Sequence, residues 1–159
     1  MRASSKHRRT ASAGMTLLEL IVATSILIIL ASATVPVARV TVKREKERQL
    51  RWALREMRTA IDRYKDAADR NLIQVQLGTE GYPPDLETLV RGVQLAGAPD
   101  RRVRFLRRIP IDPMTGQADW GLRSVQDPPE ALAWGGQNVF DVYSRSTGTA
   151  LDGTRYIDW

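Results

Sequence analysis

The sequence contains no cysteine, so no disulfide can staple the fold and no thiol can act as a nucleophile or a metal ligand. It has a single histidine, His7, and it contains no zinc-protease HExxH sequence, no P-loop and no Gly-x-Gly-x-x-Gly sequence. The common thiol, metal and nucleotide chemistries therefore lack their usual residues. We expect that the protein is not an enzyme, and that its scattered aspartates serve in turns.

Acidic residues are absent from the first fourteen positions, which hold four basic residues, Arg2, Lys6, Arg8 and Arg9. The whole chain has a net charge of +6, and without these four it has 20 basic and 18 acidic residues, a net charge of +2. The excess basicity thus lies mainly at the N-terminal tip, where it orients a membrane segment. We do not expect a nucleic-acid partner, and we interpret the basic run Arg101–Arg108 as a solvated or subunit-contacting face.

One long apolar segment runs from Leu17 to Val37 and reads LLELIVATSILIILASATVPV. Its 21 residues match the ~20 that a helix needs to cross a bilayer. It contains one charge, Glu19, and one proline, Pro36, which would remove a helical hydrogen bond and kink the helix. The flanking charges predict a cytoplasmic N-terminus with the bulk of the chain outside.

An ordinary secretion signal is the alternative reading of this segment, with cleavage after Ala33 and a soluble product that starts at Thr34. Glu19 argues against it, because an acidic residue near a membrane centre costs roughly 3 kcal/mol and gives a secretion signal no advantage. The helical pattern also continues beyond Ala33 without turn residues. We therefore favour a retained membrane helix.

The sequence GMTLLEL, which begins at Gly14, resembles the class III signal of type IV pilins and pseudopilins. The resemblance implies that a prepilin peptidase removes the leader 1–14 by cutting after Gly14 and then methylates Met15. It also implies that Glu19 directs assembly, by pairing with the N-terminal amine of a neighbouring subunit in an apolar setting. Pro36 falls where such subunits commonly have a proline.

Beyond Lys43 the sequence becomes highly charged, while apolar residues recur every three or four positions, at Leu50, Leu54, Met57, Ile61, Tyr64 and Ala68. This spacing predicts an amphipathic helix. We expect one helix from about residue 16 to 71, with a transmembrane and assembly part at 15–42 and a stalk at 43–72. Ion pairs such as Glu47–Arg51 and Asp66–Arg70 would support it.

A head domain at 73–159 follows, rich in glycine and proline. We predict a short helix capped by Asp85 and ended by Gly92, and strands near 118–124, 139–144 and 155–159. We expect the four tryptophans, Trp52, Trp120, Trp134 and Trp159, to pack the head. The predicted fold class is α+β, a long N-terminal helix packed on a small antiparallel sheet with long loops.

Three stretches of the head, YPPDLETLV at 82–90, FLRRIPIDP at 105–113 and VFDVYS at 139–144, resemble the major pseudopilin of type II secretion systems. This implies a structural subunit of a periplasmic pseudopilus that drives protein export from the bacterial inner membrane. Implied partners are the prepilin peptidase, further copies of the chain, minor pseudopilins and an inner-membrane assembly platform. Alternatives are a type IV pilus or DNA-uptake minor pilin, and a membrane-anchored or secreted binding domain.

The C-terminal loop departs from that family, whose members usually bind calcium there. Thr147 stands where the first aspartate would be, and Arg155 and Tyr156 fall near the usual acidic pair. Calcium takes six to eight oxygen ligands, and only Asp152 and Asp158 remain as candidates. We expect a degraded calcium site and a loop held by its own packing.

Overall fold

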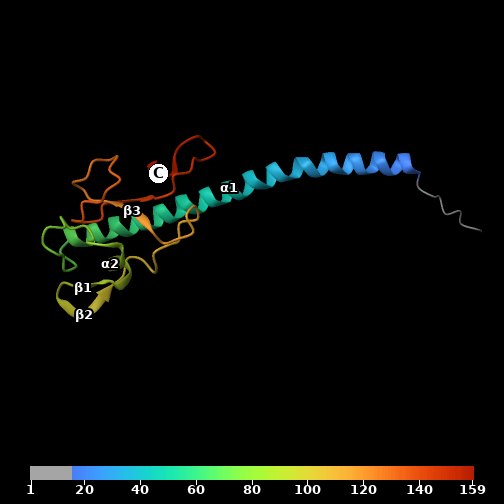
Figure 1. The fold of residues 1–159 in the computed structure, drawn as a ribbon. Helices are drawn as coiled ribbons and strands as arrows, with labels where there is room; N and C mark the ends of the chain where they lie inside the picture. The colour runs from blue at the N-terminus through green and yellow to red at the C-terminus, as the bar shows by residue number, and fades with distance from the viewer. Residues whose placement is uncertain (1–15) are drawn as a thin grey trace, which may run out of the picture. The chain divides into compact units, whose positions relative to one another are not determined.

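The structure, a computed structural model, describes residues 16–159 apart from the side chains of residues 33–38. The chain divides into two units, Met1–Thr41 and Val42–Trp159. A continuous helix, α1 (Leu17–Asp69), supplies its N-terminal part to the first unit and its C-terminal part to the second. Figure 1 shows this helix, which matches the single helix expected from about residue 16 to 71.

Asn71 ends α1. Its backbone adopts a left-handed conformation with φ of 55°, which asparagine tolerates better than most residues. The Asn71 and Leu72 amides donate to the carbonyl oxygens of Ala68 and Ala67, at 2.9 Å each. This pattern satisfies carbonyls that the helix end would otherwise leave unpaired.

The core of the second unit is built on one stripe of α1. All six apolar residues that predicted the amphipathic helix are buried. They pack against side chains from the rest of the unit, among them Leu86, Leu89, Leu106, Trp120, Val139, Val142 and Tyr156. The C-terminal part of α1 is therefore the central element of the head and not an appendage to it.

A short helix and a small hairpin follow α1 along the chain. Helix α2 (Leu86–Arg91) is capped as predicted: the Asp85 carboxylate accepts from the Thr88 amide at 2.6 Å, and Gly92 ends the helix. Strands β1 (Val93–Leu95) and β2 (Ala98–Val103) form an antiparallel pair that the sequence did not predict. An isolated bridge between Ile73 and Leu95 ties this hairpin to the segment after α1.

A second antiparallel pair joins β3 (Trp120–Arg123) to β4 (Asp141–Ser144), with Gly121 opposite Tyr143. Both strands were predicted. The head thus has two separate two-stranded sheets in place of the one sheet expected. The strand predicted near 155–159 is wrong, because this segment forms a 3-10 helix, η1 (Tyr156–Asp158), whose Tyr156 ring is buried against the core.

The tryptophans are only partly in the core. Trp120 is buried, with its indole N–H donating to the Pro110 carbonyl at 2.9 Å. The prediction is wrong for Trp52 and Trp134, which are 61% and 40% exposed. Trp52 lies off the buried stripe of α1, between Leu50 and Leu54 in sequence, so the helical period turns it away from the core.

Candidate functional site

The N-terminus of α1 contains the residues implicated in processing and assembly. Gly14 and Met15 lie outside the described residues. Thr16 is the helix N-cap: its hydroxyl accepts from the Glu19 amide at 3.2 Å, and its carbonyl accepts from the Leu20 amide at 3.1 Å. Thr16 and Glu19 have the T-x-x-E spacing of a capping box, and the bond from the Glu19 amide to the Thr16 hydroxyl is one half of it. This N-cap was not predicted from the sequence.

The Glu19 side chain is exposed and makes no ion pair with any described residue. It lies in the first turn of α1, where the helix dipole favours a negative charge. An acid is therefore locally favourable at this position, and its carboxylate remains available for a partner outside the chain.

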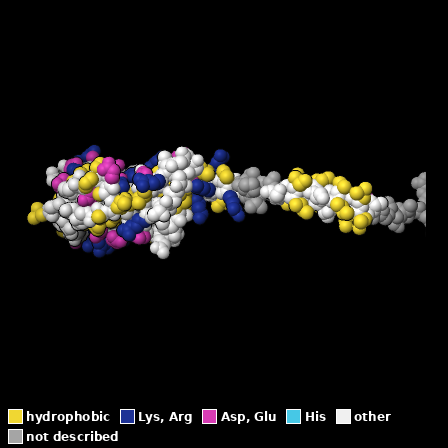
Figure 2. Space-filling view, turned by 45° about the horizontal axis from the view of Figure 1, so that its top comes forward, with side chains coloured by type: hydrophobic (Ala, Val, Ile, Leu, Met, Phe, Trp, Pro, Cys, Tyr) yellow, Lys and Arg dark blue, Asp and Glu magenta, His cyan; other side chains and the backbone are white. Residues whose placement is uncertain are grey.

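The apolar side chains on both sides of Glu19 in the sequence are also exposed. Ten of them, between Leu17 and Leu30, have 50–78% of their surface accessible. In Figure 2 hydrophobic side chains lie along both edges of this part of α1. The apolar run 26–30 is longer than one helical turn, so apolar side chains face every direction around the axis. A helix with this character requires apolar surroundings on all sides.

Among the described residues, no helix is both long enough and apolar enough to cross a membrane. The segment expected to do so runs from Leu17 to Val37, and the side chains of its residues 33–37 are outside the description. Pro36, with its expected kink, is one of them. The helical backbone of α1 continues through this position.

The two candidate calcium ligands contact different arginines. Asp152 accepts from the Thr154 amide at 3.0 Å and from its hydroxyl at 2.6 Å, and lies 3.5 Å from Arg51. The Thr154 hydroxyl, then its amide and the Arg51 charge hold the pKa of the Asp152 carboxyl below its usual value. Asp158 instead pairs with Arg155 through two contacts of 2.9 Å. Within residues 16–159, no group of three or more acidic or histidine side chains is placed to hold a metal ion.

A buried carboxylate, Glu47, connects the C-terminal loop to α1. Its Oε1 accepts from the Leu151 amide and from the Tyr156 hydroxyl, at 2.9 Å each. Burial of the phenol, and next its hydrogen bond to Glu47, raise the pKa of Tyr156 to about 12. The predicted Glu47–Arg51 pair is wrong, because Glu47 faces inward. Glu47 lies three residues before Leu50, in line with the apolar stripe, and this position could have indicated from the sequence that its side chain faces inward.

Other acidic residues serve in turns or in ion pairs. Asp112 is fully buried; it accepts from the Met114 amide at 2.7 Å and from the Ser144 hydroxyl at 2.6 Å. Asp141 accepts from Arg58 at 2.6 Å. Asp112 thus has the turn-forming role that its sequence context predicted, and it also joins its loop to β4.

No protein-family model matches the chain, and no curated protein or solved structure was found to be significantly similar to it.

Proposed function

We propose that the chain is the structural subunit of a filament of the type IV pilin kind, most like the pseudopilus of type II secretion, and that it is not a catalyst. On this proposal the prepilin peptidase cuts after Gly14 and methylates Met15. The subunit is then anchored in the bacterial inner membrane by the N-terminal part of α1, with the head in the periplasm. Copies of the chain and minor pseudopilins assemble on an inner-membrane platform.

The observation that carries this proposal is the contrast between the two parts of α1. Its N-terminal part exposes apolar side chains on all sides, such as Leu17 at 78% and Ile28 at 68%, whereas its C-terminal part buries a stripe in the head. Apolar surface of this extent is stable only in a membrane or against other helices. A membrane subunit that polymerises through its helix uses both surroundings.

Glu19 supplies the specificity of the proposed assembly. A carboxylate among apolar side chains is costly until it meets a positive charge, and the N-terminal amine of a neighbouring subunit would provide one. Losing one partner of such a buried pair costs about 3–5 kcal/mol. Subunits displaced from the correct register would therefore assemble much less readily.

The first test is the intact mass and N-terminal sequence of the protein from its native membrane. A start at Met15 with one added methyl group supports the proposal, and a start at Thr34 would replace it with an ordinary secreted protein. The second test is Glu19→Gln, which removes the charge. We expect it to abolish filaments while membrane insertion continues.

Two variants control for the second test. Glu45→Gln removes an exposed carboxylate elsewhere on α1 and should leave assembly intact. Thr16→Ala removes the N-cap but keeps the Glu19 charge. If Thr16→Ala abolished filaments as completely as Glu19→Gln, with processing unchanged in both, helix capping would explain the phenotype and the charge-pairing argument would fail.

A further inference from the structure

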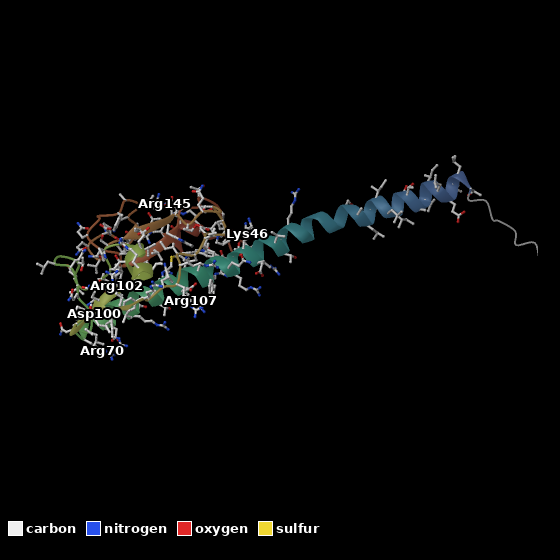
Figure 3. All side chains as sticks on the ribbon, turned by 90° about the horizontal axis from the view of Figure 1, so that it is seen from below. Lys46, Arg70, Asp100, Arg102, Arg107 and Arg145 are labelled. Atoms are coloured by element: carbon white, nitrogen blue, oxygen red, sulfur yellow. The ribbon has the colours of Figure 1, made fainter. Side chains whose placement is uncertain are left out.

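A groove runs along the C-terminal part of α1, between the helix and the segment 105–111. It consists of two adjoining hollows of about 860 and 360 Å³, which share Trp52, Glu56 and Arg107. Figure 3 shows Arg107 beside α1. The groove lies wholly within the unit Val42–Trp159, and its existence does not depend on the proposed filament function.

The walls of the groove combine apolar and positively charged side chains. Trp52 and Ile111 are 61% and 64% exposed, although both are large and apolar. Four arginines line the two hollows: Arg55, Arg63, Arg107 and Arg108. None of these four forms an ion pair with a described residue, whereas Arg48, Arg58, Arg70 and Arg123 elsewhere in the head all do.

We infer that this groove binds an acidic, extended protein segment that carries at least one apolar side chain. Four unpaired guanidinium groups against the single carboxylate of Glu56 favour an anionic ligand, since arginine holds carboxylates through paired hydrogen bonds. Exposed tryptophan beside arginine is the composition of binding hot spots in protein interfaces. The charge and the apolar surface thus point to the same class of ligand.

The length of the groove sets the size of the segment. Its residues on α1 extend from Gln49 to Arg63, which at 1.5 Å per residue is about 21 Å. An extended peptide advances about 3.3–3.6 Å per residue. The groove therefore accommodates about six residues of an extended chain.

Nucleic acid fits the groove less well. Single-stranded nucleic acids are held by several aromatic side chains on which successive bases stack. Here Trp52 is the one strongly exposed aromatic side chain among the groove residues, since Phe105 packs edge-on against Tyr64 with ring centroids 5.3 Å apart.

The test is fluorescence anisotropy with the full chain in a non-ionic detergent and a labelled peptide of three glutamate–leucine repeats. We expect it to bind at least tenfold more tightly than a peptide of three lysine–leucine repeats. Trp52→Ala and Arg107→Glu should each weaken binding by about tenfold. The matched control is Arg101→Glu, an exposed arginine of β2 outside the groove, which should change binding by less than twofold.

Three results would overturn the inference. The first is equal binding of the acidic peptide by all variants, which would mean that the groove is not its site. The second is tighter binding of a thymidine dodecamer that depends on Trp52 and Arg107, which would identify a nucleic-acid groove. The third is self-association, measured by analytical ultracentrifugation, that Trp52→Ala abolishes and the acidic peptide does not displace, which would make the groove a contact between copies.

Discussion

Replacing Glu47 with alanine should release the C-terminal segment from α1. The carboxylate oxygen of Glu47 is the acceptor for both the Leu151 amide and the Tyr156 hydroxyl, and both Glu47 and Tyr156 are buried, at 5% and 4% exposure. Glu47→Ala removes the acceptor of both donors. The Tyr156 hydroxyl is buried and has few ways to recover the lost bond, whereas Leu151 is 42% exposed and its amide can turn to water.

The magnitude follows from those two donors. An unsatisfied buried donor costs about 1–3 kcal/mol, and this applies to the Tyr156 hydroxyl. Leu151 is 42% exposed, so its amide can bond to water, and the free energy of unfolding should fall by about 2 kcal/mol in total. For a domain of roughly 100 residues this corresponds to a Tm lower by about 10 °C. Glu47→Gln keeps an acceptor oxygen in place and should cost about 1 kcal/mol, because it replaces charge-assisted hydrogen bonds with neutral ones.

The assay is thermal unfolding followed by near-ultraviolet circular dichroism, with amide hydrogen exchange at Leu151 as a local readout. Glu45→Ala is the matched control, because Glu45 lies two residues away on the same helix and pairs only at the surface. It should leave Tm within about 2 °C. If Glu47→Ala melted like Glu45→Ala and kept the Leu151 amide protected, the inward-facing carboxylate would not be what holds the loop.

Two further predictions concern single side chains in the head. Gly121→Ala should lower the free energy of unfolding by about 2–4 kcal/mol, because a Cβ there would lie 2.1 Å from Tyr143 Cζ. The control is Gly97→Ala, at φ +84° with open space around it, which should cost about 1 kcal/mol in a chemical-denaturation experiment. Equal effects of the two substitutions would contradict the steric reasoning. Because the pKa of Tyr156 is raised to about 12, its contribution is fully present below pH 10 and is lost between about pH 10 and pH 12. Between about pH 10 and pH 12, the free energy of unfolding of Tyr156→Phe should therefore fall less than that of the wild type. An equal fall in the two proteins would argue against a buried phenol.

The helical parts of the fold could be predicted because their signals are local. Apolar residues spaced by three and four indicated α1, and the Asp85 and Gly92 caps indicated α2. The β1–β2 hairpin had no such signal: its turn contains Gly97, and Pro99 lies inside β2. A proline is tolerated on a strand that has a partner on one side only. The strand arises from backbone pairing rather than from side-chain preference.

The contacts that hold the C-terminal loop were predicted less completely than the helices, because they join residues that are far apart in the sequence. Glu47 and Tyr156 are 109 positions apart in sequence, and nothing local indicates that they meet. The aromatic Tyr156 and Trp159 suggested a strand, although their rings in fact pack edge-on with centroids 5.2 Å apart at η1. Aromatic residues occur both in strands and in other buried segments, so their presence here could not distinguish a strand from a packed 3-10 helix.

A second stripe on α1 explains how a head without disulfides holds its C-terminus. Lys43, Glu47, Arg51 and Arg58 are spaced by four, four and seven residues, which places them on one side of the helix. Lys43 donates to the Thr149 carbonyl at 2.7 Å, the Arg51 guanidinium lies 4.1 Å from the centre of the Trp159 ring, and Arg58 donates to the Trp159 carbonyl at 3.1 Å.

These four side chains differ in how strongly they can hold the segment. Lys43, Arg51 and Arg58 keep access to solvent, so water competes for their contacts, and ordering their long side chains costs entropy. Glu47 is the buried member of the stripe, and the hydrogen bonds of a buried carboxylate are lost without replacement when it is removed. The C-terminal segment should therefore depend on Glu47 more than on its three cationic neighbours, although all four occupy the same side of α1. A charged residue at helical spacing can lie on a solvated face or can hold another segment against the helix, and its burial distinguishes the two roles.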